Sequence, residues 1–192
     1  MKRQLATLSR WLHIYISMMS FAILFFFAIT GLTLNHTEWI AGQQKTTQAR
    51  GELKPEWLNG PQVAKLEVVE HLRKAHNIRG ALSDFRIDEL QCGVSFKGPG
   101  YAADTFVDRK TGRYDLTETR SGVVAVLNDL HKGRDSGGKW SLLIDISAVL
   151  MTLVSLTGIL LILLLKRYRM SGLVVALGGT VASWAVYAVF VP

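Results

Sequence analysis

The sequence contains a single cysteine, Cys92, among 192 residues. An intrachain disulfide, and a zinc or iron–sulfur site held by several cysteines, are therefore excluded. We expect Cys92 to be a small, buried, apolar residue. The sequence also lacks the HExxH, Walker, GxGxxG and GxSxG patterns. Nothing local therefore indicates a zinc protease, a nucleotide-binding protein or a serine hydrolase.

Charge is missing from three long segments. Residues 12–34 and 170–192 contain no formally charged side chain, and residues 140–165 contain only Asp145. About 20 apolar residues in a helix are enough to cross a hydrocarbon core of ~30 Å. This pattern excludes a water-soluble globular protein. It predicts three transmembrane helices, at residues 12–36, 139–166 and 172–192.

Basic residues gather beside these segments, which indicates an orientation. They lie in the tail 1–11 and around the loop 167–171, and comprise Lys2, Arg3, Arg10, Lys166, Arg167 and Arg169. Short basic segments face the cytoplasm by the positive-inside rule, so the N-terminus is predicted there and the C-terminus across the membrane. The net charge of +7 lies mostly at the lipid bilayer, so no nucleic-acid partner is expected.

Residues 37–138 are the one polar part long enough to fold in water, and their pattern predicts a small α+β domain. A helix is expected at residues 62–76, opened by Gly60-Pro61, with His71 and His76 on its solvated face. Residues 83–87, 91–97, 105–107 and 113–116 alternate like strands. Residues 108–112 form a tight turn in which Gly112 takes a positive φ, and residues 121–130 form an amphipathic segment. We therefore expect one helix on an antiparallel sheet.

Three histidines lie near the ends of the apolar segments. His13 is at the cytoplasmic end of the first, His36 is at its outer end, and His131 precedes the second. His13 and His36 are roughly 34 Å apart in a continuous helix, so they cannot serve one site in one protomer. Imidazole is an axial ligand of haem iron, so the three are candidate ligands. The alternative is that each is an interfacial side chain with its polar tip in water.

Charged residues near His131 extend this hypothesis. Lys132 and Arg134 are candidates to neutralise haem propionates or hold an anionic iron chelate, or they merely begin a membrane helix. Asp145 is a candidate partner for a ligating imidazole, or an iron or proton site. The alternative for Asp145 is an ion pair with Lys139 or Arg134, or a carboxylate that simply extends to the lipid–water interface.

The sequence resembles the PepSY-associated transmembrane helix family in several motifs. These are Arg-Trp-Leu-His at 10–13, Thr-Gly-Leu-Thr-Leu-Asn-His at 30–36, Asp-Leu-His-Lys-Gly-Arg at 129–134 and Ile-Asp at 144–145. Residues 107–108 and 111–112 are also similar to a PepSY hairpin. The resemblance implies a bacterial inner-membrane protein with a PepSY-like periplasmic domain at 37–138. It also implies haem b and reduction of periplasmic ferric iron or ferric siderophore.

Three candidate ligands are an odd number, which leads us to expect a homodimer. His36 and His131 then ligate an outer haem, while His13 and its symmetry mate share an inner one; the alternative is one outer haem only. The chain is too small for a nicotinamide- or flavin-binding fold, so the electron donor is a separate cytoplasmic flavin or nicotinamide donor, or a membrane quinol. The alternative function is a non-enzymatic, membrane-anchored PepSY-like domain that modulates a transporter, sensor or peptidase.

Overall fold

The structure is a computed structural model of the chain, and it describes residues 2–40, 42–59 and 62–192. The chain forms two compact units. One comprises Met1–Phe26 with Asp145–Pro192, and the other comprises Phe27–Ile144. The predicted helix start at Gly60-Pro61 lies outside the described residues.

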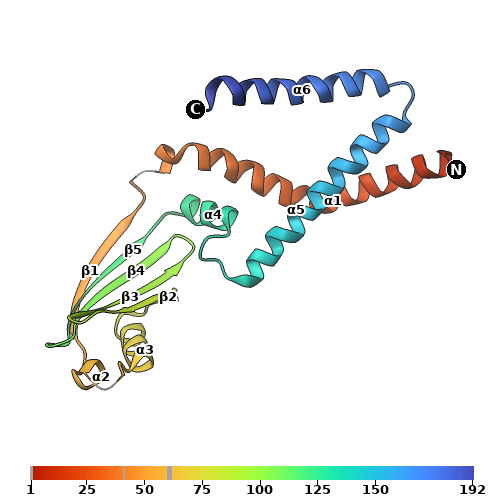
Figure 1. The fold of residues 1–192 in the computed structure, drawn as a ribbon. Helices are drawn as coiled ribbons and strands as arrows, with labels where there is room; N and C mark the ends of the chain where they lie inside the picture. Colours follow the sequence, from red (N-terminus) through yellow and green to blue (C-terminus); the bar gives the residue numbers. More distant parts are fainter. Residues whose placement is uncertain (1, 41, 60–61) are drawn as a thin grey trace. The chain divides into compact units, whose positions relative to one another are not determined.

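Three helices have the length and composition of membrane spans (Figure 1). They are α1 (Lys2–Asn35), α5 (Gly138–Leu164) and α6 (Arg169–Phe190), with mean hydropathies of 2.1, 2.5 and 1.9 over their apolar windows. The protein is therefore a multi-pass membrane protein, as predicted. Helix α1 already begins at Lys2, so the predicted tail 1–11 is largely helical. At 1.5 Å per residue α1 is about 50 Å long, which exceeds a ~30 Å hydrocarbon core.

In the first unit, α1 and α5 contact each other through small and polar side chains. Ser9 and Ser20 of α1 are each only 3% exposed, and Ser9 Oγ lies 3.5 Å from the carbonyl oxygen of Thr157. Small residues let membrane helices approach closely, because the backbones are not held apart by long side chains. Helix α6, in contrast, has no buried residue.

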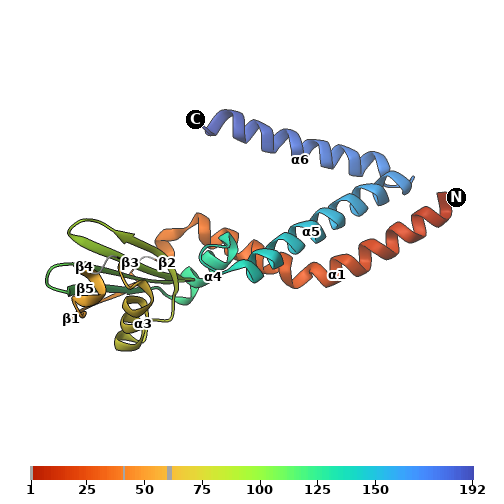
Figure 2. The same ribbon diagram turned by 60° about the horizontal axis from the view of Figure 1, so that its bottom comes forward.

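The second unit contains a five-stranded antiparallel sheet, which confirms the predicted α+β architecture (Figure 2). Its strands are β1 (Lys45–Glu52), β2 (Ala81–Ile87), β3 (Gln91–Gly98), β4 (Tyr101–Asp108) and β5 (Arg113–Arg120), in the order β1-β5-β4-β3-β2. The short helix α2 (Glu56–Asn59) and helix α3 (Lys65–His76) follow β1 in the chain. Strand β1 was not predicted, and α3 begins three residues later than expected.

Helix α3 covers one face of the sheet and forms the core with it. Cys92, Val94 and Phe96 alternate along β3 and are at most 1% exposed, as expected for the inward face of a half-buried strand. They pack in one cluster with Val68 and Leu72 of α3. The prediction that Cys92 is buried is confirmed, and burial raises the pKa of its thiol.

The prediction of a solvated face for the α3 histidines is wrong for His76. Its Nε2 lies 2.8 Å from the hydroxyl of Tyr114 on β5. His76 is four residues after the buried Leu72, so the two share a face of the helix. Burial is the main reason that the pKa of His76 is lowered, and the nearby His71 adds to the effect.

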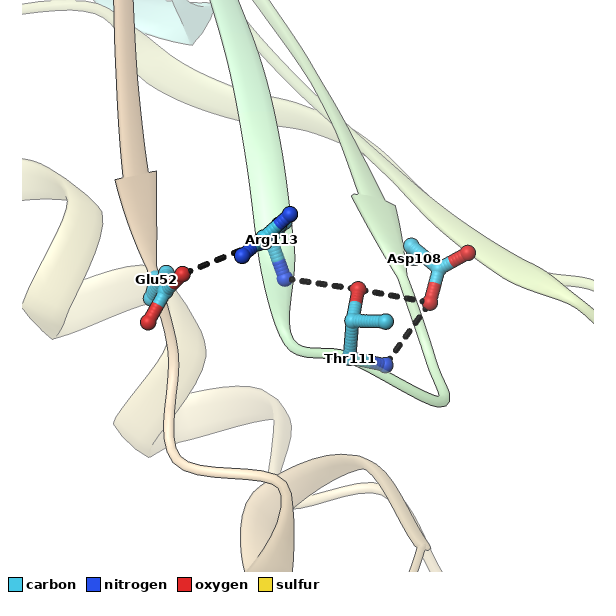
Figure 3. Close-up of polar contacts among 4 residues, drawn as sticks. All are labelled: Glu52, Asp108, Thr111 and Arg113. Atoms are coloured by element: carbon cyan, nitrogen blue, oxygen red, sulfur yellow. Dashed lines mark hydrogen bonds and ion pairs between the residues drawn. The ribbon is translucent and has the colours of Figure 1, made fainter.

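The turn between β4 and β5 has the predicted conformation (Figure 3). Asp108 Oδ1 accepts hydrogen bonds from the backbone N–H and the hydroxyl of Thr111, at 2.8 and 2.9 Å. These two bonds are the main cause of the lowered pKa of Asp108. Gly112 has φ +75°, as predicted, and its carbonyl accepts a 2.8 Å bond from the N–H of Leu53. The turn is thus tied to the chain that follows β1.

Candidate functional site

His13 lies on α1 and bonds to α5 through one ring nitrogen. Its Nδ1 is 3.2 Å from the carbonyl oxygen of Val154 and 3.0 Å from Thr157 Oγ1. A carbonyl oxygen only accepts hydrogen bonds, so Nδ1 carries the proton and donates it. In the neutral imidazole, Nε2 then holds the free lone pair. Among the described residues, Nε2 has no hydrogen-bond partner.

The Thr157 hydroxyl supports the same assignment. Its Oγ1 lies 2.8 Å from the carbonyl oxygen of Leu153 and 2.9 Å from that of Val154, one turn earlier in α5. A hydroxyl has a single proton, and this bonding to the preceding turn is common for threonine in helices. With its proton donated there, the hydroxyl accepts the Nδ1–H of His13.

His131 makes a comparable contact in the second unit. It lies near the end of α4 (Val123–Lys132), and its Nδ1 is 2.6 Å from Thr30 Oγ1 on α1. Its ring meets the Phe27 ring edge-on, with centroids 4.9 Å apart. Thr30 is only 2% exposed, so this polar contact is shielded from solvent. His131 is therefore a partly buried side chain that fixes α4 to α1.

Helix α4 is held by three further contacts that position His131. Thr33 Oγ1 donates a 2.6 Å bond to Oδ1 of the buried Asn128. Asp129 accepts the backbone N–H of Gly100 from the sheet. Trp140 Nε1 donates to the carbonyl oxygen of Leu130, at 2.8 Å, and so satisfies a carbonyl in the last turn of the helix.

His36 lies near the end of α1, and the partners of its ring differ from those of the His131 ring. It follows the last residue of α1, stacks on Trp39 with ring centroids 4.1 Å apart, and places Nδ1 3.0 Å from Glu38 Oε1. The carboxylate oxygen is an acceptor, so Nδ1 again carries a proton. His13, His36 and His131 thus each engage Nδ1, whereas His76 engages Nε2.

The charged candidates are exposed. Lys132 and Arg134 follow His131 at the end of α4 and have no ion-pair partner within the described part of their unit. Asp145 is exposed on α5, and its carboxylate likewise has no ion-pair partner among the described residues of its unit. The ion pairs of Asp145 with Lys139 and Arg134 remain predictions.

Sequence reasoning missed the partners of two histidines. Thr157 and Val154 lie within hydrogen-bond distance of His13 Nδ1, and Thr30 lies within hydrogen-bond distance of His131 Nδ1. A signal was present, because Thr30 and Thr157 are each followed by glycine in an otherwise apolar segment. Within the apolar segments, this dipeptide occurs at both positions at which a histidine packs on a helix.

These features define a class of protein: a three-span membrane protein whose sequence carries a small α+β domain between the first two spans. Residues 7–192 match the PepSY_TM-like family, so the chain belongs to that family. No curated protein matches the chain, and no solved structure matches it.

Proposed function

We propose that the chain is a haem b protein of the bacterial inner membrane that passes electrons to periplasmic ferric iron or ferric siderophore. One observation carries the proposal. Nδ1 of His13 donates to Val154 and Thr157, which leaves Nε2 available as a metal ligand. A histidine that ligates a metal usually donates its other ring N–H to a carbonyl or a carboxylate, because that bond orients the ring and makes it more basic.

Nδ1 is engaged in the other two candidate ligands as well. The Glu38 carboxylate accepts a hydrogen bond from Nδ1 of His36, and the Thr30 hydroxyl lies 2.6 Å from Nδ1 of His131. His76 is different, since its Nε2 lies against Tyr114 and would have to leave it to bind a metal. The three predicted ligands therefore suit a haem ligated through Nε2. His76 of the sheet domain differs from them, because its Nε2 is already engaged.

When bound, haem would supply one-electron transfer from a cytoplasmic flavin or nicotinamide donor, or a membrane quinol, to periplasmic Fe³⁺, which would become Fe²⁺. The chain itself would hold the iron through imidazoles and surround the site with apolar helices that exclude water. The exposed Lys132 and Arg134 would attract an anionic iron chelate toward His131.

The proposed assembly is a homodimer. His36 and His131 would serve an outer haem, and His13 would share an inner haem with its symmetry mate. The haem-to-protein ratio distinguishes this arrangement from one outer haem only. A His13→Ala protein that retains its full haem content would exclude the inner site.

The function is tested by a reduced-minus-oxidised absorption spectrum with haem stoichiometry on the full chain in detergent. We expect low-spin b-type bands that decrease in His13→Ala, which removes the inner haem, and decrease in His36→Ala or His131→Ala, which remove the outer haem. His71→Ala is the matched control, because His71 lies in the sheet domain, where its ring meets the Trp57 ring edge-on. Its spectrum should equal that of the wild type.

The alternative is the non-enzymatic, membrane-anchored domain that modulates a transporter, sensor or peptidase. The bonds of His13 and His131 support this alternative, because each of them joins two helices. Under this alternative the protein expressed with a haem supply is colourless. A colourless, folded protein would overturn the proposed haem function.

A further inference from the structure

The dipeptide Thr-Gly occurs at both positions where a candidate ligand packs on a helix. At Thr157-Gly158, the hydroxyl is 3.0 Å from His13 Nδ1, and a Cβ added to the glycine would lie 3.3 Å from His13 Cε1. At Thr30-Gly31, the hydroxyl is 2.6 Å from His131 Nδ1, and the corresponding distance to Cε1 is 3.7 Å. In each pair the threonine bonds the ring and the glycine leaves space for its edge.

We propose that Thr30 and Thr157 are positioning residues for the two histidines, an inference that rests on the proposed haem function. Each hydroxyl accepts Nδ1–H and so holds the tautomer in which Nε2 carries the lone pair that binds iron. The threonines do not touch the metal; they act through the imidazole. Without Thr30, the His131 ring can rotate and either nitrogen can carry the proton, whereas His13 without Thr157 keeps the Val154 carbonyl as an acceptor.

The direction of the hydrogen bond follows from where each hydroxyl sends its proton. Thr157 has two carbonyl acceptors in the preceding turn, at 2.8 and 2.9 Å. Thr30 has the Phe27 carbonyl at 3.4 Å, which is the same i−3 arrangement at longer range. Donation to those carbonyls leaves each hydroxyl as an acceptor for Nδ1–H.

The two histidines differ in how much they depend on the threonine. His13 Nδ1 has a second acceptor, the Val154 carbonyl at 3.2 Å. For His131, Thr30 is the one Nδ1 acceptor among the described residues, and its burial keeps water from replacing it. Removing the threonine hydroxyl should therefore disturb the orientation and tautomer of His131 more than those of His13.

The test uses the isosteric variants Thr30→Val and Thr157→Val and the hydroxyl-preserving variants Thr30→Ser and Thr157→Ser. Thr152→Val is the matched control, because Thr152 lies on α5 and bonds the Ala148 carbonyl at 2.8 Å without any histidine. Haem affinity is measured by titrating haem into the apoprotein in detergent. The midpoint potential is measured by spectroscopic redox titration.

We expect Thr30→Val to weaken haem binding by about 10-fold to 100-fold, the usual effect of losing a partner of a metal ligand. Its midpoint potential should rise, because a histidine without this bond is a less basic ligand and stabilises ferric iron less. Thr157→Val should change both quantities less. In both serine variants the haem affinity and the midpoint potential should be close to the wild-type values. In Thr152→Val both quantities should equal them.

His13→Ala and His131→Ala separate the possible failures. If these variants keep the full haem content, the proposed function fails together with this inference. If they lose haem while the valine variants keep wild-type affinity and potential, the positioning role alone is overturned. If a valine variant does not fold, a serine variant that folds but fails to keep wild-type haem affinity also overturns it.

Discussion

The backbone N–H of Gly100 donates a 2.9 Å hydrogen bond to Oδ2 of Asp129. Gly100 belongs to the turn between β3 and β4, and Asp129 lies on α4 two residues before His131. The glycine has φ +65°, and a Cβ there would collide with Val126 of the same helix. The sheet domain therefore fixes the helix that carries a candidate haem ligand.

Asp129→Ala should loosen this connection. Loss of a charged acceptor leaves the Gly100 N–H without its partner, so we expect the free energy of unfolding to decrease by about 1–3 kcal/mol. Hydrogen exchange measured on the full chain should show faster exchange at the Gly100 amide. Asp115→Ala is the control, because Asp115 forms an exposed pair with Arg50, and such pairs contribute little to stability. Unchanged exchange at Gly100 would contradict the connection.

Acidification should destabilise the sheet domain through His76. Burial lowers its pKa from the ordinary value of 6.5, so below pH 6.5 the unfolded chain binds a proton that the folded chain does not. Stability is therefore fully present above pH 6.5 and decreases as the pH falls toward the folded pKa. The measurement is exchange of the Phe96 amide between pH 7 and about pH 5.

Variants of the two α3 histidines provide the comparison. His76→Gln should remove this part of the pH dependence, because glutamine does not titrate. His71→Gln should only weaken it, since the charge on His71 is the second cause of the lowered pKa of His76 and burial is the first. A pH dependence that His76→Gln leaves unchanged would rule out His76 as its source.

Glycine-to-alanine substitutions should separate the two histidine contacts. The Cβ of Gly158→Ala would lie 3.3 Å from His13 Cε1, which is too tight without movement of the ring. The Cβ of Gly31→Ala would lie 3.7 Å from His131 Cε1, an ordinary contact. Nitrogen NMR of histidine-labelled protein should show a changed His13 signal in the first variant only. Equal changes in both would show that the difference in space is unimportant.

Gly112→Ala should destabilise the hairpin more than Gly137→Ala destabilises its own turn. Both glycines have positive φ, +75° and +80°, so both alanines incur about 1–2 kcal/mol of backbone strain. Only at Gly112 would the Cβ also collide with the Leu53 carbonyl, while Gly137 has open space. Thermal unfolding of the two variants should therefore differ, and similar melting temperatures would argue against the collision.

The sequence predicted the features that depend on local composition. The three spans follow from long uncharged segments, and the conformation of Gly112 follows from a turn motif that only a few residues determine. Strand β1 was missed because Lys45–Glu52 is polar and mostly exposed, without the alternation of a half-buried strand. It is an edge strand, and its pairing with β5 depends on residues far along the chain.

The candidate site was predicted only in part for a similar reason. His13, His36 and His131 stand out, because imidazoles are uncommon beside apolar segments. Their partners do not, since Thr157 is 144 residues from His13 and Thr30 is 101 residues from His131. A hydroxyl in a membrane helix can bond its own preceding turn, so the threonine by itself does not reveal a distant imidazole, and the glycine that follows it is the one local signal.

Lys45 and Arg120 are partners in register, so the chain enters the sheet through β1 and leaves it from β5 at the same end of two neighbouring strands. Hydrogen bonds between antiparallel strands run perpendicular to them. Tension applied where α1 and α4 connect to the sheet would therefore break these bonds one after another, beginning at Lys45, instead of shearing them all together. This edge would unzip under a small pulling force while the core around Phe96 keeps its packing.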